Sequence, residues 1–148
     1  MRKSLKVLFG VVIVVVAALL YAWPYVEMEL AGFANYTEQD KREYEFYTPD
    51  ILKKMPRITE NYDFDFANIT GPAKHVNAVK FYGTDNTSKI DAYLTAIGYK
   101  KQDECDLNSS CWRASDPNET IYVGILTGEK TVIVQVVYDF THNVSRAN

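Results

Sequence analysis

An uninterrupted apolar segment near the N-terminus limits the fold of this chain more than any other feature. Residues 7–26, VLFGVVIVVVAALLYAWPYV, contain no charged side chain. At a rise of about 1.5 Å per residue, a helix of this length spans roughly 30 Å, the thickness of the hydrocarbon core of a bilayer. A helix in a water-soluble core rarely lacks a polar face over such a length. The segment therefore predicts a transmembrane helix, which we assign to residues 1–26 with its basic flank.

The charges on either side of the segment predict its orientation. Arg2, Lys3 and Lys6 precede it, whereas the first charged residues after it are Glu27 and Glu29. Positive charge on a short N-terminal side keeps that side in the cytoplasm. We therefore expect a single-pass protein of the inner membrane, with its N-terminus cytoplasmic and its C-terminal part periplasmic.

Aromatic residues gather at the far end of the segment, where their amphipathic rings suit the membrane interface. These interface residues are Tyr21, Trp23 and Tyr25. A cleaved signal peptide is the alternative, with Leu20-Tyr21-Ala22 as the nearest match to a small-x-small cleavage site. Leucine fits that site poorly and Pro24 follows closely, so we favour an uncleaved anchor. Both interpretations export the rest of the chain.

The only two cysteines, Cys105 and Cys111, lie in the exported part. An even number of thiols outside the cytosol predicts a disulfide, here closing the short Asp106–Ser110 loop. A metal site would need more ligands, and His75 and His142 are far away in sequence. We expect no cofactor.

The charge balance of the exported part differs from that of the whole chain. Three of the 16 Lys and Arg residues stay with the anchor, which leaves 13 against 19 Asp and Glu, a difference of about −6. Such a surface disfavours nucleic acid and would complement a basic protein partner.

The exported part is expected to contain two regions. Residues 27–61 predict a helical connector, with Thr37 and Thr48 as candidate helix caps. Residues 62–148 predict an α+β domain, an antiparallel sheet of element order β-β-α-β-β-β with one helix packed on it. Strands are expected at 62–66, at 75–82, from Tyr99 onward, at 121–126 and at 131–140, and the helix is expected at 88–97. Turns are expected at 70–72 and 127–130.

Two side chains on the last strand stand out. Ile133 and Val137 are apolar although they face away from the main apolar side of that strand. Either the helix covers one face of the sheet and the connector the other, or the second face meets a partner.

No pattern in the chain predicts catalysis. His75 and His142 have no acidic or thiol neighbour at metal-ligand spacing. Asp63 and Asp65 project from one face of a strand, which suits an acid–base pair but is also the usual wet side of a half-buried strand. We expect a protein that is not an enzyme.

Six asparagines begin an N-x-[ST] triplet, which marks glycan acceptors in some exported proteins. The short anchor and its flanks favour coincidence here. The six are Asn35, Asn68, Asn86, Asn108, Asn118 and Asn143.

The residues around the cysteine loop are the candidate partner-binding site. They combine aromatic area, an arginine and an acidic cluster, which are common in recognition surfaces. The set is Tyr99, Asp103, Glu104, Asp106, Trp112, Arg113 and Tyr122. The aromatic residues and Arg113 are expected to be exposed anchors.

We therefore expect a membrane-anchored periplasmic domain that binds protein. Its design is similar to that of small tethered immunity or inhibitor proteins that protect bacterial envelopes from secreted toxins. The alternative is an accessory subunit of an inner-membrane secretion or pilus-type complex, in which the anchor itself carries interactions.

Overall fold

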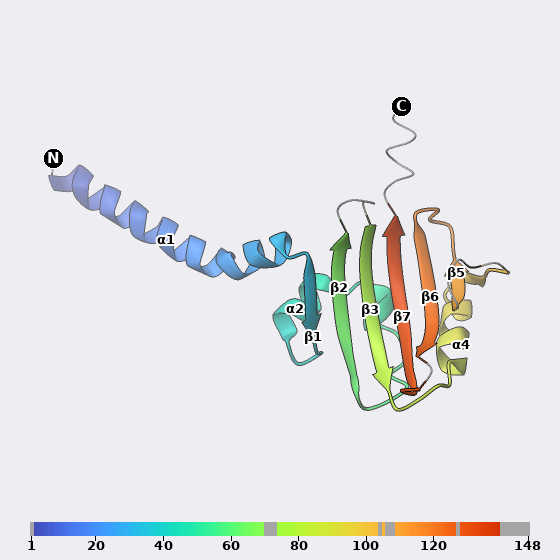
Figure 1. The fold of residues 1–148 in the computed structure, drawn as a ribbon. Helices are drawn as coiled ribbons and strands as arrows, with labels where there is room; N and C mark the ends of the chain where they lie inside the picture. Colours follow the sequence, from blue (N-terminus) through green and yellow to red (C-terminus); the bar gives the residue numbers. More distant parts are fainter. Residues whose placement is uncertain (1, 70–73, 104, 106–108, 127, 140–148) are drawn as a thin grey trace. The chain divides into compact units, whose positions relative to one another are not determined.

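The computed structural model describes residues 2–69, 74–103, 105, 109–126 and 128–139 (Figure 1). The chain divides into two compact units, Met1–Ala31 and Gly32–Asn148. The predicted turn at 70–72 and the predicted strand end at Phe140 lie outside the described residues.

The first unit is a single long helix, α1 (Arg2–Leu30). Its part from Arg2 to Met28 is long and apolar enough to cross a membrane, with a mean hydropathy of 2.6 over its most apolar 18 residues. Pro24 lies inside the helix; prolines are tolerated in transmembrane helices. In the predicted interface region, Trp23 Nε1 donates a hydrogen bond of 2.8 Å to Oε1 of Glu27, which lies one helical turn further along. The helix fits a single-pass membrane anchor.

The second unit is built on a seven-stranded sheet in which all neighbouring strands are antiparallel, in the order β1-β2-β3-β7-β6-β5-β4 (Figure 1). The strands are β1 (Phe33–Tyr36), β2 (Tyr62–Ile69), β3 (Lys74–Tyr82), β4 (Lys100–Lys101), β5 (Ser110–Arg113), β6 (Glu119–Leu126) and β7 (Thr131–Asp139). The helices of this unit are α2 (Lys41–Tyr47), α3 (Asp50–Lys53) and α4 (Ser88–Ala96). The predicted α+β class and antiparallel sheet are confirmed.

The two faces of the sheet differ because side chains alternate along each strand. The helix-covered face carries the fully buried aromatic and aliphatic side chains, and α4 adds Ile90 and Leu94 to this core. In Figure 1, α2, α3 and α4 all lie behind the sheet. The core strand residues on this face are Phe64, Val79, Phe81, Ile121, Val123, Val132, Val134 and Val136. The opposite face, which we name the open face, has none of the described helices of this unit over it.

An aromatic cluster fixes α2 and β1 to the helix-covered face. Phe64 lies at its centre, stacked on Tyr36 at 5.6 Å between ring centroids and edge-on to Tyr44 at 5.3 Å. Tyr47 stacks on Phe66 at 4.6 Å. Aromatic contacts of this kind contribute beyond the area that they bury.

Arg57 joins this cluster to the end of α3. Its Nη1 donates to the backbone carbonyls of Leu52 at 2.7 Å and Met55 at 3.2 Å, which lie at the end of the short helix. Its Nη2 donates to Tyr44 Oη at 3.0 Å, and the guanidinium lies over the Phe64 ring at 5.4 Å. One side chain therefore satisfies carbonyls at the α3 terminus and covers the aromatic core.

The end of α4 follows the sequence prediction. Gly98 has a positive φ of +99°, and the amides of Gly98 and Tyr99 donate to the carbonyls of Thr95 and Leu94 at 3.2 and 2.9 Å. This pair of hydrogen bonds is a Schellman motif, in which glycine adopts the left-handed conformation without a steric penalty. The helix begins at Ser88, as expected, and Thr87 is the N-cap residue.

The region expected to be a helical connector is only partly helical. Residues 27–30 continue α1, and residues 33–36 form β1, which pairs with β2 from Phe33↔Ala67 to Tyr36↔Phe64. The backbone carbonyl of Gly32 already accepts a hydrogen bond of 2.9 Å from Asn68 N–H. Pairing with β2 overrides local preference in this four-residue strand.

The element order after Tyr62 is β-β-α-β-β-β-β rather than the expected β-β-α-β-β-β. The single extended segment expected from Tyr99 onward is two strands, β4 and β5. The cysteine loop lies between them, which interrupts the pairing.

Candidate partner-binding surface

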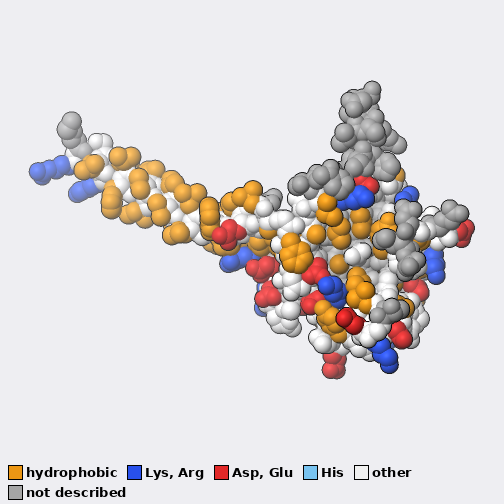
Figure 2. Space-filling view, in the orientation of Figure 1, with side chains coloured by type: hydrophobic (Ala, Val, Ile, Leu, Met, Phe, Trp, Pro, Cys, Tyr) orange, Lys and Arg blue, Asp and Glu red, His pale blue; other side chains and the backbone are white. Residues whose placement is uncertain are grey.

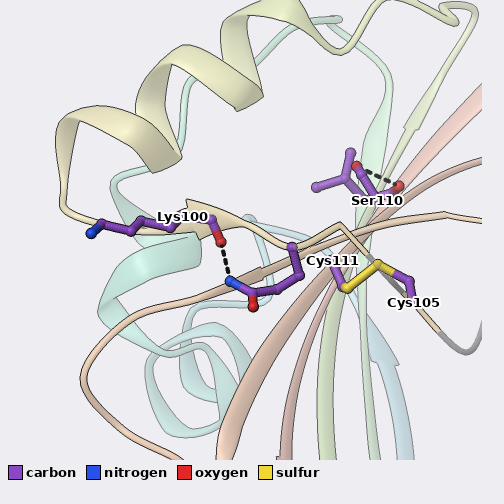
Figure 3. The surroundings of a disulfide bond; sticks show 6 residues. Lys100, Cys105, Ser110 and Cys111 are labelled. Atoms are coloured by element: carbon purple, nitrogen blue, oxygen red, sulfur yellow. Dashed lines mark hydrogen bonds between the residues drawn. A yellow bond between two sulfur atoms is a disulfide. The ribbon is translucent and has the colours of Figure 1, made fainter.

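The predicted disulfide between Cys105 and Cys111 is present (Figure 3). The two Cα atoms are 5.9 Å apart, within the usual range for a disulfide. Cys111 lies on β5 and is buried, and its carbonyl accepts a hydrogen bond of 2.8 Å from Gln102 N–H. The loop is therefore attached to the sheet at both ends, through β4 and β5.

Replacing both cysteines with serine should lower the free energy of unfolding by about 2 kcal/mol, because a short loop gives a small loss of chain entropy in the unfolded state. Denaturant titration of the full chain in detergent micelles, with and without reductant, measures the loss. The double variant should be insensitive to reductant, whereas the wild-type chain should match it only after reduction. Equal stability of the two oxidised proteins would contradict this expectation.

The open face combines apolar side chains with paired charges. Val76, Ile133 and Val137 are half-buried there, although α2, α3 and α4 lie on the other face. Figure 2, which has the orientation of Figure 1, shows hydrophobic side chains gathered over this face of the sheet. The alternative in which the connector covers this face is wrong, because α2 and α3 lie on the same side as α4. Tyr93 Oη of α4 donates to the carbonyl of Ile51 in α3 at 2.8 Å.

The acidic residues of β2 also lie on the open face, as their spacing predicts. Asp65 accepts a hydrogen bond of 2.7 Å from Asn35 Nδ2 and forms an ion pair with Lys80, with Nζ 2.8 Å from its carboxylate. Asp63 accepts a hydrogen bond of 2.8 Å from Tyr82 Oη. Each carboxylate has its own partner on a neighbouring strand, so the arrangement crosslinks β1, β2 and β3.

Three of the predicted partner-binding residues lie together near the disulfide. Tyr122 pairs with Cys111 across β5 and β6, and both project onto the open face with Arg113. Arg113 and Asp103 are exposed. Glu104 and Asp106 lie outside the described residues.

Trp112 and Tyr99 were expected to be exposed anchors, but neither is an exposed residue in the structure. Trp112 is only 4% exposed, so it is a core residue and not an exposed anchor. The alternation in β5 directs Cys111 and Arg113 to the open face and Trp112 to the helix-covered face. A four-residue strand gives too short a pattern to indicate which side is buried.

Tyr99 belongs to a buried polar cluster at the start of β6. Its hydroxyl donates to the carboxylate of Glu119, which is 8% exposed, and Tyr138 also hydrogen-bonds to Glu119. Burial, and then the contact with Glu119, raise the pKa of both tyrosine hydroxyls well above the usual value of 10. Sequence reasoning missed this cluster because its members come from three separate segments.

A hollow of about 650 Å³ lies between the disulfide loop, the start of α4 and the last residues of β6. Its lining includes Thr87, Lys101, Asp103, Ser109 and Ile125. A smaller hollow of about 170 Å³ adjoins it on the open face, beside Tyr122 and Ile133. Within the described part of the chain, no group of three or more His, Cys, Asp or Glu side chains could hold a metal ion. His142 is not among the described residues.

Compared with protein-family models, with curated protein sequences and with solved structures, the chain shows no match.

Proposed function

We propose that this protein is a single-pass inner-membrane protein whose periplasmic domain binds another protein, as an immunity or inhibitor protein against a toxin that acts in the cell envelope. The observation that carries the proposal is the open face of the sheet. Apolar side chains lie half-exposed there, and the helices of the same unit, α2, α3 and α4, pack on the other side.

The compartment follows from two features that support each other. The apolar segment 7–26 of α1 is preceded by basic residues and followed by acidic ones, which favours export of the C-terminal part. A disulfide persists in an oxidising compartment such as the periplasm. The sheet begins at Phe33, within a few residues of the end of α1 at Leu30.

The open face supports protein binding by its composition. Val76, Ile133 and Val137 provide apolar area at its centre, and contiguous exposed apolar area on a folded domain is typical of interaction sites. Tyr122 and Arg113 lie near one edge, and both residue types are enriched in binding hot spots. The negative balance of about −6, from 13 basic against 19 acidic residues after Lys6, favours a basic partner.

Crosslinking in intact cells followed by purification of the membrane fraction tests the proposal. The wild-type chain should recover one defined protein. Ile133→Lys on the open face should lose it, whereas Ala92→Lys at an exposed position on α4 should retain it. Recovery of no partner, or equal recovery with both variants, would count against the open face as the binding surface.

Exchanging residues 7–26 for an unrelated transmembrane helix separates the two functional classes. An immunity protein should still protect cells from its toxin, because the exported domain does the binding. An accessory subunit of a secretion or pilus-type complex should lose its function, because its anchor takes part in assembly.

A further inference from the structure

The strand β1 forms one edge of the sheet. It comes first in the strand order and pairs with β2 on one side (Figure 1). Residues 30–69, which include both strands and the segments on either side of β1, all belong to the described part of the chain. Within the described ranges, no second strand pairs with β1 on the side away from β2. We name this side the outer edge.

The hydrogen bonds between β1 and β2 identify the backbone groups that point to the outer edge. The carbonyl of Gly32 accepts a hydrogen bond of 2.9 Å from the N–H of Asn68 in β2, so the backbone of residue 32 faces β2. Backbone groups alternate between the two sides along an antiparallel strand. Ala34 therefore also faces β2, whereas the N–H and C=O of Phe33 and Asn35 face the outer edge.

The amides that follow the same alternation before and after the strand already have acceptors. The N–H of Ala31 donates to the carbonyl of Met28 at 3.4 Å, at the end of α1. The N–H of Thr37 donates to the carboxylate of Asp40 at 2.9 Å, in the turn after β1. The outward groups of the strand itself have no such partner among the described residues. The unpaired edge is therefore limited to two residues.

The side chains of β1 leave the outer edge uncharged and open. Phe33 is 65% exposed. The side chain of Asn35 is held over β2, because its Nδ2 donates to Asp65 Oδ1 at 2.7 Å and to the carbonyl of Phe64 at 3.3 Å. The strand at the other edge of the sheet, β4, consists of two lysines, a common device against strand pairing. β1 has neither a charge nor a proline, so its edge lacks that protection.

The outward groups of β1 match those of a second, antiparallel copy of the same strand. When Ala34 of one copy lies opposite Ala34 of the other, Phe33 of each copy lies opposite Asn35 of the other. Both of these pairs are then of the hydrogen-bonded type, so every outward N–H and C=O of the two strands finds a partner. The Ala34 pair is of the non-hydrogen-bonded type, in which the side chains are closest and a small residue fits best. The two Phe33 rings become diagonal neighbours on the open face, within reach of each other.

We propose that two copies of this chain pair their β1 strands in antiparallel orientation, centred on Ala34, and so form a dimer with one continuous sheet. Such a twofold interface uses the same surface of both copies, as in most homodimers. Both copies carry α1, which fits a membrane anchor, and chains held in one membrane meet at a high effective concentration, which favours pairing through a short strand. The inference goes beyond the proposed function, because it needs no other protein.

Disulfide crosslinking of the full chain in liposomes tests this register. In the proposed pair the Cα atoms of the two copies of residue 34 are about 4.5 Å apart, a separation that a disulfide can bridge. The native cysteines already bond to each other. Ala92→Cys, at an exposed position on α4, is the matched control for random collisions. With a mild oxidant, Ala34→Cys should give at least about five times more crosslinked dimer than Ala92→Cys; equal yields would overturn the proposal.

A proline added to the Ala34→Cys chain separates strand pairing from association through α1. Phe33→Pro removes an N–H that faces the outer edge and leaves the pairing with β2 intact, as prolines on edge strands do. Phe33→Ala is the control that keeps this N–H. We expect the proline to lower the crosslinked yield at least about fivefold and the alanine to lower it less than about threefold. Chains that associate only through α1 would crosslink equally with and without the proline, and that result would overturn the proposal.

Amide hydrogen exchange in the wild-type chain makes the test independent of how the variants fold. Exchange at Phe33 and Asn35 should be at least about tenfold slower in nanodiscs that contain two chains than in nanodiscs that contain one. The amide of Ala34, which faces β2, should exchange at the same rate in both. Equal rates at Phe33 and Asn35 in the two preparations would contradict pairing through β1.

Discussion

Replacing Phe64 with alanine should lower the free energy of unfolding of the domain by about 3–5 kcal/mol, the usual cost of removing a fully buried phenylalanine. Phe64 is 0% exposed and contacts the rings of Tyr36 and Tyr44 and the guanidinium of Arg57. These partners come from β1, α2 and the segment after α3. The cavity would therefore loosen the contacts that hold this whole region to the sheet.

Denaturant titration of the full chain in detergent micelles, followed by near-ultraviolet circular dichroism, measures this loss. Phe33→Ala is the matched control, because Phe33 is in the same sheet but is 65% exposed. It should change stability by less than about 0.5 kcal/mol. A loss below 1 kcal/mol for Phe64→Ala would contradict the assignment of this ring cluster to the core.

The parts of the fold that sequence predicted are those with long, regular patterns. The uncharged run at 7–26 is longer than the stretches without a polar face that helices of soluble proteins contain, and it forms most of α1. The alternation at 62–66, 121–126 and 131–140 indicated the long strands β2, β6 and β7, the last of which is described as far as Asp139. Gly98 follows a helical stripe, and a helix end there requires the positive φ that glycine allows.

The parts that sequence missed are short or depend on distant partners. Four residues, Phe33 to Tyr36, cannot reveal a period, and their strand exists because β2 offers an edge. Trp112 was expected at the surface because aromatic residues favour binding sites. Its burial depends on which face of β5 meets the helices, and that is a tertiary property.

The candidate site was predictable to a similar degree. The disulfide followed from two cysteines in an exported segment, and Ile133 and Val137 indicated an unusual second face. The buried cluster of Tyr99, Glu119 and Tyr138 could not be foreseen, because its members come from three separate segments.

Stability should fall in alkali, beginning near pH 10. Burial raises the pKa of Tyr36 to about 12, an effect that its hydrogen bond with Thr48 partly offsets. Burial and Glu119 raise the pKa of Tyr99 and Tyr138 as well. A folded-state pKa above the unfolded value of about 10 means that the folded state holds the proton more tightly. The stabilisation is therefore complete below pH 10 and is lost as the pH rises through the folded-state value.

For Tyr36, which is 3% exposed, a rise from 10.0 to about 12 corresponds to roughly 3 kcal/mol of stability lost by linkage at high pH. Denaturant titrations of the full chain at pH 7, 9, 10, 11 and 12 measure the loss. Tyr36→Phe separates this effect from general alkaline damage. It should be less stable at pH 7, because Thr48 loses its hydroxyl partner, yet it should lose less stability than the wild-type chain between pH 9 and 12. Parallel pH profiles for the two proteins would show that ionisation of Tyr36 does not drive alkaline unfolding.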